Sequence, residues 1–210
     1  RYIQRDEALV AWPGIWDTDR VRYPGMHSRS AGWWENRVLR DPAWPGPAGF
    51  SSLFNVQYEE GGKPLGYARY RIKEHYENGS AASVLSGQSL HGNTYEAYSA
   101  LWQHIFGVDL VGKIQAEWRR TDEPLYAMLA DPRRLVRRPS DTLWVRIVDT
   151  VQALEARRYR TAGALVIELR DDFCPWNGGR YVIEGGPDGA RCSHTTKTAD
   201  LTMTVNELGA

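Results

Sequence analysis

Two adjacent carboxylates and a nearby tryptophan are the residues whose types and spacing could do chemistry. Asp171 and Asp172 open a loop that also holds Cys174 and Trp176. Carboxylates beside an indole ring can attract the ammonium groups of a polyamine, through their charge and through the face of the ring. Asp is also a common turn residue, because its side chain hydrogen-bonds to the nearby backbone. We favour the turn role and keep the polyamine as the alternative.

A dense run of arginines is a second candidate, for binding anions. Residues 131–140 contain four arginines between Pro132 and Pro139, a pattern that could hold a phosphate or an acidic partner. The chain of 210 residues, however, has 26 basic and 26 acidic side chains and a formal net charge of zero. Because no wider basic field surrounds the run, we favour a solvated connector and expect no nucleic-acid binding.

Other catalytic signatures are missing from the sequence. It has no Gly-x-Ser-x-Gly elbow, no phosphate-binding Walker loop, no His-Glu-x-x-His and no dinucleotide-binding glycine motif. None of the five histidines has an acid or a nucleophile at a telling spacing: His27, His75, His91, His104 and His194. We therefore assign no catalytic residue and no metal ligand.

The cysteines and the apolar runs indicate the cellular setting. Cys174 and Cys192 form no Cys-x-x-Cys pair, so we favour buried free thiols, with a bridge between adjacent strands as the alternative. The longest apolar run is far short of the ~20 residues that a membrane span needs, and no signal-peptide pattern opens the chain. We expect a soluble cytoplasmic protein without a membrane span.

The first part of the chain predicts strands followed by a helix. Strand-like runs separated by turns come at 50–59, 65–74 and 81–90, and Asn78-Gly79 is a strong hairpin signal. Asn93 can cap the helix and Gly107 ends it. Its apolar face repeats at i, i+3, i+4, i+7: Tyr98, Leu101, Trp102 and Ile105. A strand near 113–119 and a short helix near 125–130 follow.

Residues 1–49 are rich in tryptophan. Ser30 can cap a short helix in which Trp34 and Val38 share one face. We favour core and interface packing for all five of these tryptophans: Trp12, Trp16, Trp33, Trp34 and Trp44.

The last third of the chain predicts a sheet of at least four strands. Leu165, Ile167 and Leu169 alternate with more polar residues, and similar alternation recurs around Tyr181 and Ile183 and again at 201–205. A hairpin signal lies at 185–189, and a strand at 143–148 and a helix at 150–158 come first. We read 132–140 as a linker between two domains.

Several unusual motifs recur in an order that resembles the enhanced intracellular survival (Eis) acetyltransferases, over nearly the whole chain. They are Pro24-Gly25-Met26, Trp33-Trp34-Glu35, Ala100-Leu101-Trp102, Asp109-Leu110-Val111, residues 143–149, 153–157, 173–181 and 185–190, and Ala199-Asp200-Leu201. The resemblance implies an α+β chain in two domains. Residues 1–131 are expected to form a non-catalytic, GNAT-like mixed-sheet domain, and 141–210 a truncated, sterol-carrier-protein-like α/β sandwich that is incomplete at its C-terminus.

The resemblance also implies a cofactor, acetyl-CoA, which the parent protein binds in a further N-terminal domain that this chain lacks. A catalytic GNAT domain holds the pyrophosphate on bare backbone N–H groups of a Gln/Arg-x-x-Gly-x-Gly/Ala turn. The nearest matches here are 22–27, where Pro24 has no N–H, and 160–165, which leads into a strand. We therefore expect no cofactor site in this chain. Arg1 and the helix-like residues near the end suggest a piece of a longer protein.

Site residues enter only through the resemblance. Trp33 or Trp34 is expected to form an aromatic wall for a cationic amine substrate, and Asp149, with Trp144 nearby, to neutralise its ammonium group. The role that we favour for Asp149 is to cap the following helix together with Gln152. The family's mechanism, as the resemblance implies it, uses a tyrosine of the missing N-terminal domain as the acid and the carboxylate at the end of the parent protein as the base. Ala210 of this chain is not expected to take the place of that terminal carboxylate.

Three hypotheses about function follow. The first is the non-catalytic portion of an Eis-type N-acetyltransferase, which shapes an amine pocket and assembles a homo-oligomer. The second is a lipid or apolar-ligand binding module in the sterol-carrier-like domain. It depends on whether the apolar face of the sheet is covered without a void by the helix at 150–158. The third is a role in assembly alone.

Overall fold

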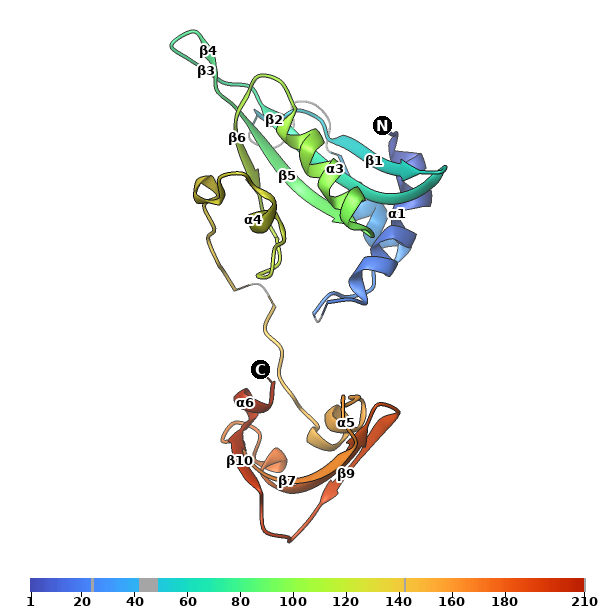
Figure 1. The fold of residues 1–210 in the computed structure, drawn as a ribbon, viewed down its shortest axis with the longest axis vertical. Helices are drawn as coiled ribbons and strands as arrows, with labels where there is room; N and C mark the ends of the chain where they lie inside the picture. The colour runs from blue at the N-terminus through green and yellow to red at the C-terminus, as the bar shows by residue number, and fades with distance from the viewer. Residues whose placement is uncertain (24, 42–48, 142, 210) are drawn as a thin grey trace. The chain divides into compact units, whose positions relative to one another are not determined.

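The computed structural model describes residues 1–23, 25–41, 49–141 and 143–209. The chain divides into two compact units, Arg1–Pro139 and Ser140–Ala210, coloured from blue to yellow and from orange to red in Figure 1. This division falls at the end of the predicted linker. Within the described residues, no helix is long and apolar enough to cross a membrane. Pro24 and Trp44, which belong to the quoted motifs and the packing tryptophans, lie outside those residues.

The first unit is built on a four-stranded sheet in the order β1-β2-β5-β6. Its strands are β1 (Phe54–Glu60), β2 (Lys63–Lys73), β5 (Ser83–Gly92) and β6 (Val111–Ala116). The first three pair antiparallel, whereas β6 runs parallel to β5, so the sheet is mixed as predicted. A small hairpin of β3 (Tyr76–Glu77) and β4 (Ser80–Ala81) turns at Asn78 and Gly79, whose φ angles are 49° and 81°. The predicted hairpin is confirmed.

Helix α3 (Tyr95–Phe106) connects β5 to the parallel strand β6 and packs on one face of the sheet (Figure 1). Leu101, Trp102 and Ile105 are buried against strand residues, which confirms the predicted apolar face. Gly107 ends the helix as predicted. The predicted cap is wrong by one residue, because the side chain of Thr94, and not of Asn93, accepts the backbone N–H of Ala97 at 3.1 Å.

Helix α1 (Arg5–Arg20) was not predicted, because Pro13 and Gly14 in its middle both disfavour helix. Tertiary packing outweighs that propensity. Trp12 is fully buried, stacks on Tyr67 of β2 with ring centres 4.4 Å apart, and donates from Nε1 to Gln57 Oε1 at 2.9 Å. Tyr67 and Ala68 are neighbours on β2. Tyr67 is buried in a cluster with residues of α1, whereas Ala68 is buried in a cluster with residues of α3. The two helices therefore cover opposite faces of the sheet.

Among its described residues the first unit has four further short helices: α2 (Ala31–Trp33), η1 (Trp34–Val38), α4 (Leu125–Met128) and η3 (Pro132–Arg134). Ser30 caps the first of them by accepting the N–H of Trp33 at 3.2 Å. Trp34 and Val38 are both buried in the cluster around α1, so their shared face is confirmed.

The second unit is a sheet in the order β10-β7-β8-β9. Its elements are α5 (Thr150–Glu155), β7 (Gly163–Arg170), η4 (Pro175–Asn177), β8 (Gly179–Gly186), β9 (Gly189–His194), β10 (Leu201–Thr204) and α6 (Val205–Gly209). Helix α5 packs on the sheet through Leu154, which lies against Ile167 and Tyr181. Both cysteines are buried free thiols, as favoured from the sequence.

One predicted strand of the second unit is absent. Residues 143–148 have an irregular backbone and pair with no strand in the part of the chain that the structure describes. Leu143, Trp144, Val145 and Val148 are all exposed. Their apolar character suggested a half-buried strand, but β10 already occupies one edge of the sheet and β9 the other.

Candidate functional site

The candidate site of the first unit is the opening between β5 and β6. The two parallel strands pair only as far as Gly87 and Ala116, whereas β5 continues to Gly92. Beyond that point the backbone groups of β5 need other partners. Openings of this kind are common places for ligands, because a ligand can supply the missing partners.

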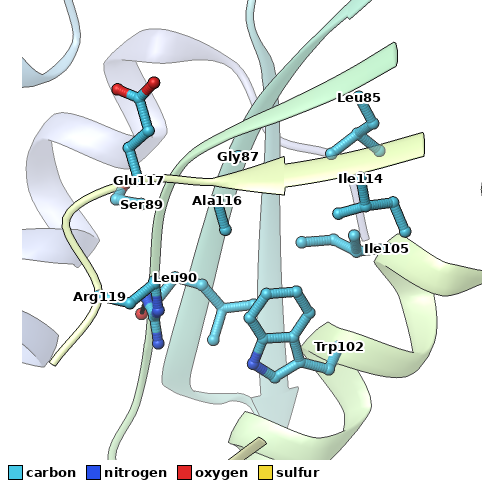
Figure 2. A pocket seen from close by; sticks show the side chains of 10 residues that line it. All are labelled: Leu85, Gly87, Ser89, Leu90, Trp102, Ile105, Ile114, Ala116, Glu117 and Arg119. Atoms are coloured by element: carbon cyan, nitrogen blue, oxygen red, sulfur yellow. Dashed lines mark hydrogen bonds between the residues drawn. The ribbon is translucent and has the colours of Figure 1, made fainter. Parts of the chain in front are cut away.

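Side chains of the protein itself fill this opening. Trp102 and Ile105 extend into it from α3, and Arg119 reaches under β5 from the segment after β6 (Figure 2). Arg119 Nη1 donates to the carbonyl oxygen of Leu90 at 2.8 Å, so this β5 carbonyl is already satisfied. The space that remains is about 10 Å³, room for about one water molecule.

Arg119 is fixed in the opening by two further neighbours. Its Nε donates to Glu123 Oε2 at 2.7 Å, and its Cζ lies 5.7 Å from the centre of the Trp102 ring. Burial lowers the pKa of Arg119 to about 10 and raises the pKa of Glu123 to about 7. The guanidinium of Arg119 is thus held by a carbonyl, a carboxylate and an indole ring, and it occupies the opening.

The start of α3 does not offer the second feature that acetyl-CoA would need. The N–H of Ala97 is taken by the Thr94 side chain, and Glu96 adds a negative charge to the first turn. A Cβ on Gly92 would lie 2.7 Å from the backbone nitrogen of Tyr98, so the turn lies directly against the helix. The described residues therefore do not fit the diphosphate and the acyl arm of acetyl-CoA at this place.

In the second unit, Asp171 organises the loop between β7 and β8. Its Oδ1 accepts the N–H groups of Cys174 at 2.8 Å and Phe173 at 3.2 Å, and its Oδ2 accepts Asn177 Nδ2 at 3.2 Å. Burial opposes ionisation, but these hydrogen bonds and the charge of Arg146 outweigh it and lower the pKa of Asp171. Asp171 thus has the turn role that we favoured.

The loop also holds the irregular segment 143–148. Arg146 pairs with the Asp171 carboxylate, donates to Cys174 Sγ at 3.2 Å and lies 4.8 Å from the Phe173 ring centre. Trp176 Nε1 donates to the carbonyl of Val148 at 3.0 Å. These polar contacts fix the backbone of the segment and leave its apolar side chains outside.

The four predicted site residues occupy different settings. Trp33 is 42% exposed and meets the edge of His27, whereas Trp34 is 2% exposed and faces Tyr67 in the core. In the second unit Trp144 is 84% exposed. Asp149 caps α5, as favoured: its Oδ1 accepts the Gln152 N–H at 2.9 Å and its Oδ2 accepts Gln152 Nε2 at 2.8 Å.

Sequence reasoning missed the two arginines that hold these sites, Arg119 and Arg146. Arg119 and Glu123 are four residues apart, a spacing typical of ion pairs, and this signal was available. Nothing local in the sequence marks Arg146, because its partner Asp171 is 25 residues away.

Comparisons with known proteins identify a protein family for each of the two units. A model of the acetyltransferase (GNAT) domain matches residues 25–147, and one of the sterol carrier protein domain matches 150–210. An uncharacterized N-acetyltransferase of Streptomyces avermitilis is 38% identical over 187 residues, 89% of this chain and 45% of the relative. The N-acetyltransferase Eis of Mycobacterium tuberculosis is 29% identical over 215 residues, 100% of this chain and 48% of that protein.

A solved structure extends the likeness to three dimensions. The crystal structure of Eis1 from Mycobacterium abscessus matches with a TM-score of 0.71 at 29% identity, over 99% of this chain and 49% of that one. The chain spans about half the length of the curated relatives that it matches.

Proposed function

Because the chain belongs to the acetyltransferase (GNAT) domain family and continues into a sterol carrier protein domain, we propose that it is the non-catalytic middle and C-terminal portion of an Eis-type N-acetyltransferase. The parent protein transfers an acetyl group from acetyl-CoA to an amine. This chain shapes the amine pocket and helps to assemble a homo-oligomer, and its partner is the acetyl-CoA-binding domain of the parent. A cytoplasmic location is part of the proposal.

One observation carries the non-catalytic role. The opening between β5 and β6 is filled by Trp102 and by Arg119, which is bound to Leu90 and Glu123. To admit a ligand, the Arg119 guanidinium would have to leave the Leu90 carbonyl and the Glu123 carboxylate, which are buried with it. Leaving such groups unpaired is costly, so the closed arrangement is strongly favoured.

The exposed aromatic side chains support a role in the amine pocket. Trp144 offers an exposed ring to a cation, whereas Trp34 is buried and the half-exposed Trp33 already has the Arg37 guanidinium 5.8 Å from its ring centre. Asp149 is held in place by Gln152 at the start of α5. A carboxylate and an indole are together the chemistry that recognises an ammonium group.

Steady-state kinetics of the parent protein test the pocket role. We expect Trp144→Ala to raise the KM for the amine about 3- to 10-fold, the range of a partly desolvated cation–π contact, and to leave acetyl-CoA affinity unchanged. Trp118→Ala is the matched control, since Trp118 is a similarly exposed tryptophan of the first unit. An equal KM for both variants would contradict a pocket role for Trp144.

Light scattering tests the assembly role. The parent protein is expected to form a homo-oligomer, and the acetyl-CoA-binding domain without residues 1–210 is expected to be monomeric. If that domain alone keeps the full oligomer size, this chain has no part in the assembly.

No observation favours the alternative of an apolar-ligand module. Leu154 of α5 is buried in one cluster with Ile167, so this helix covers part of the apolar face of the sheet. Leu165 and Leu201 remain exposed on the second unit. Native mass spectrometry that finds a lipid bound to the purified chain would revive this alternative.

A further inference from the structure

A second hollow in the first unit is not used by the proposed function. It lies where α1 ends, where α3 begins and where residues 119–124 pass, and it is lined from all three segments. Its volume is about 140 Å³. This is far larger than the space left in the opening between β5 and β6, and it is enough for a phosphate group.

Three arginines line this cleft, Arg22 from the segment after α1 and Arg119 and Arg120 from the segment after β6. Arg22 follows α1, and it has no carboxylate within ion-pair distance among the described residues; its Nη1 donates to the carbonyl of Asn93 at 2.9 Å. Arg120 lies flat on Tyr23, with Cζ 3.4 Å from the ring centre, and its Nε is 3.2 Å from the exposed Asp122. The forks of Arg22 and Arg120 are thus held in position with further N–H groups free.

Negative charge is scarce in the cleft. Asp19 is the one carboxylate among the lining residues, and it is engaged by His91, whose Nδ1 lies 3.0 Å from Asp19 Oδ2. Burial lowers the pKa of His91, and the positive charges of Arg119 and Arg29 lower it further, against the effect of Asp19. Next to the lining, Glu123 pairs with Arg119 at 2.7 Å and Asp122 with Arg120 at 3.2 Å, so Arg22 is the lining arginine whose charge no carboxylate of the described residues balances.

We propose that this cleft binds a small phosphate-type oxyanion, gripped by Arg22 and Arg120. The bound group is a free phosphate or the phosphate of a small monoester. Binding would give Arg22 the negatively charged partner that it lacks among the described residues. The site differs from the filled opening between β5 and β6, and its existence does not depend on the parent's acetyltransferase activity.

Calorimetry of the chain 1–210 with sodium phosphate at pH 7.5, against sodium chloride at the same ionic strength, tests the proposal. We expect saturable phosphate binding and a phosphate-specific rise in Tm. Arg22→Gln and Arg120→Gln are each expected to weaken the affinity at least tenfold. Arg134→Gln, which removes an exposed arginine of the same unit outside the cleft, is expected to leave it unchanged.

One further variant and one further ligand complete the test. Tyr98→Phe removes a hydroxyl that is closed off from the cleft and retains the packing of the ring, so it is expected to leave binding unchanged. Tighter binding of glycerol 3-phosphate than of inorganic phosphate would identify a monoester as the ligand, and weaker binding a free anion. The proposal is overturned if the unmodified chain shows no phosphate-specific effect, or if all variants bind phosphate equally.

Discussion

The two units place their large aromatic side chains in opposite settings. In the first unit Trp12, Trp34 and Trp102 are buried by residues of the same unit. In the second unit Trp144 and Phe173 are 84% and 80% exposed, although polar contacts fix the backbone around them. The first unit therefore uses most of its described tryptophans to build a core and leaves Trp33 and Trp118 exposed, whereas the second uses ion pairs and hydrogen bonds to hold an aromatic surface. In the second unit a fixed backbone, and not a core, determines where Trp144 and Phe173 lie.

Substitution of tryptophan by alanine gives the largest expected contrast between the units. Trp12→Ala removes a buried ring that stacks on Tyr67 and is expected to cost about 3–5 kcal/mol of unfolding free energy. Trp144→Ala is expected to change stability by less than about 0.5 kcal/mol, since its ring is exposed. Urea denaturation followed by circular dichroism measures both. Similar losses for the two variants would remove the contrast.

The carboxylate that fixes the aromatic surface gives the next effect. Asp171→Ala leaves the N–H groups of Phe173 and Cys174 and the guanidinium of Arg146 without their acceptor. We expect the thermal midpoint of the second unit to fall by roughly 5–10 °C. Asp172→Asn is the matched control, because Asp172 is exposed, and is expected to have little effect. Equal midpoints for the two variants would mean that Asp171 does not organise the loop.

The cap of α5 is a smaller, local feature of the second unit. Asp149→Ala removes the acceptor of the Gln152 N–H and is expected to cost about 1 kcal/mol. Asp149→Asn retains a capping oxygen and should recover most of that loss. Chemical denaturation of both variants distinguishes a cap from a purely electrostatic role, in which Asn would be as harmful as Ala.

The smallest expected effect concerns pH and the first unit. The pKa of buried His91 is below its ordinary value, so the unfolded chain takes up a proton at a higher pH than the folded chain. The stability that His91 contributes is present above about pH 6.5 and is lost as the pH falls below that value. We expect Tm to decrease between pH 7.5 and 5.5, and His91→Gln to reduce this decrease by about 2 °C. An unchanged slope in the variant would contradict this role.

Local patterns of the sequence were enough to predict much of the fold. Asn78-Gly79 supports positive φ angles and so marks its hairpin, and the spacing of Leu101, Trp102 and Ile105 marks the buried face of α3. In the second unit the alternation around Tyr181 and Ile183 identified a strand with one buried face. Each of these features is decided by neighbours in the sequence.

The features that were missed depend on distant residues. Helix α1 survives Pro13 because Trp12 packs on Tyr67, 55 positions later in the sequence. Segment 143–148 has the composition of a strand, yet it is held irregularly by Asp171 and Trp176. The prediction of no cofactor site depended on Pro24 in 22–27 and on the strand that follows 160–165, and it did not involve Arg119, which fills the opening between β5 and β6.

Isothermal titration of acetyl-CoA into the chain 1–210 and, in parallel, into the parent protein is the most direct test of the proposed function. We expect no saturable binding by the chain at ligand concentrations up to about 1 mM, because Arg119 and Trp102 occupy the opening between β5 and β6. The parent is expected to bind acetyl-CoA with micromolar affinity. Stoichiometric binding by the chain alone, with an affinity close to that of the parent, would contradict the non-catalytic role.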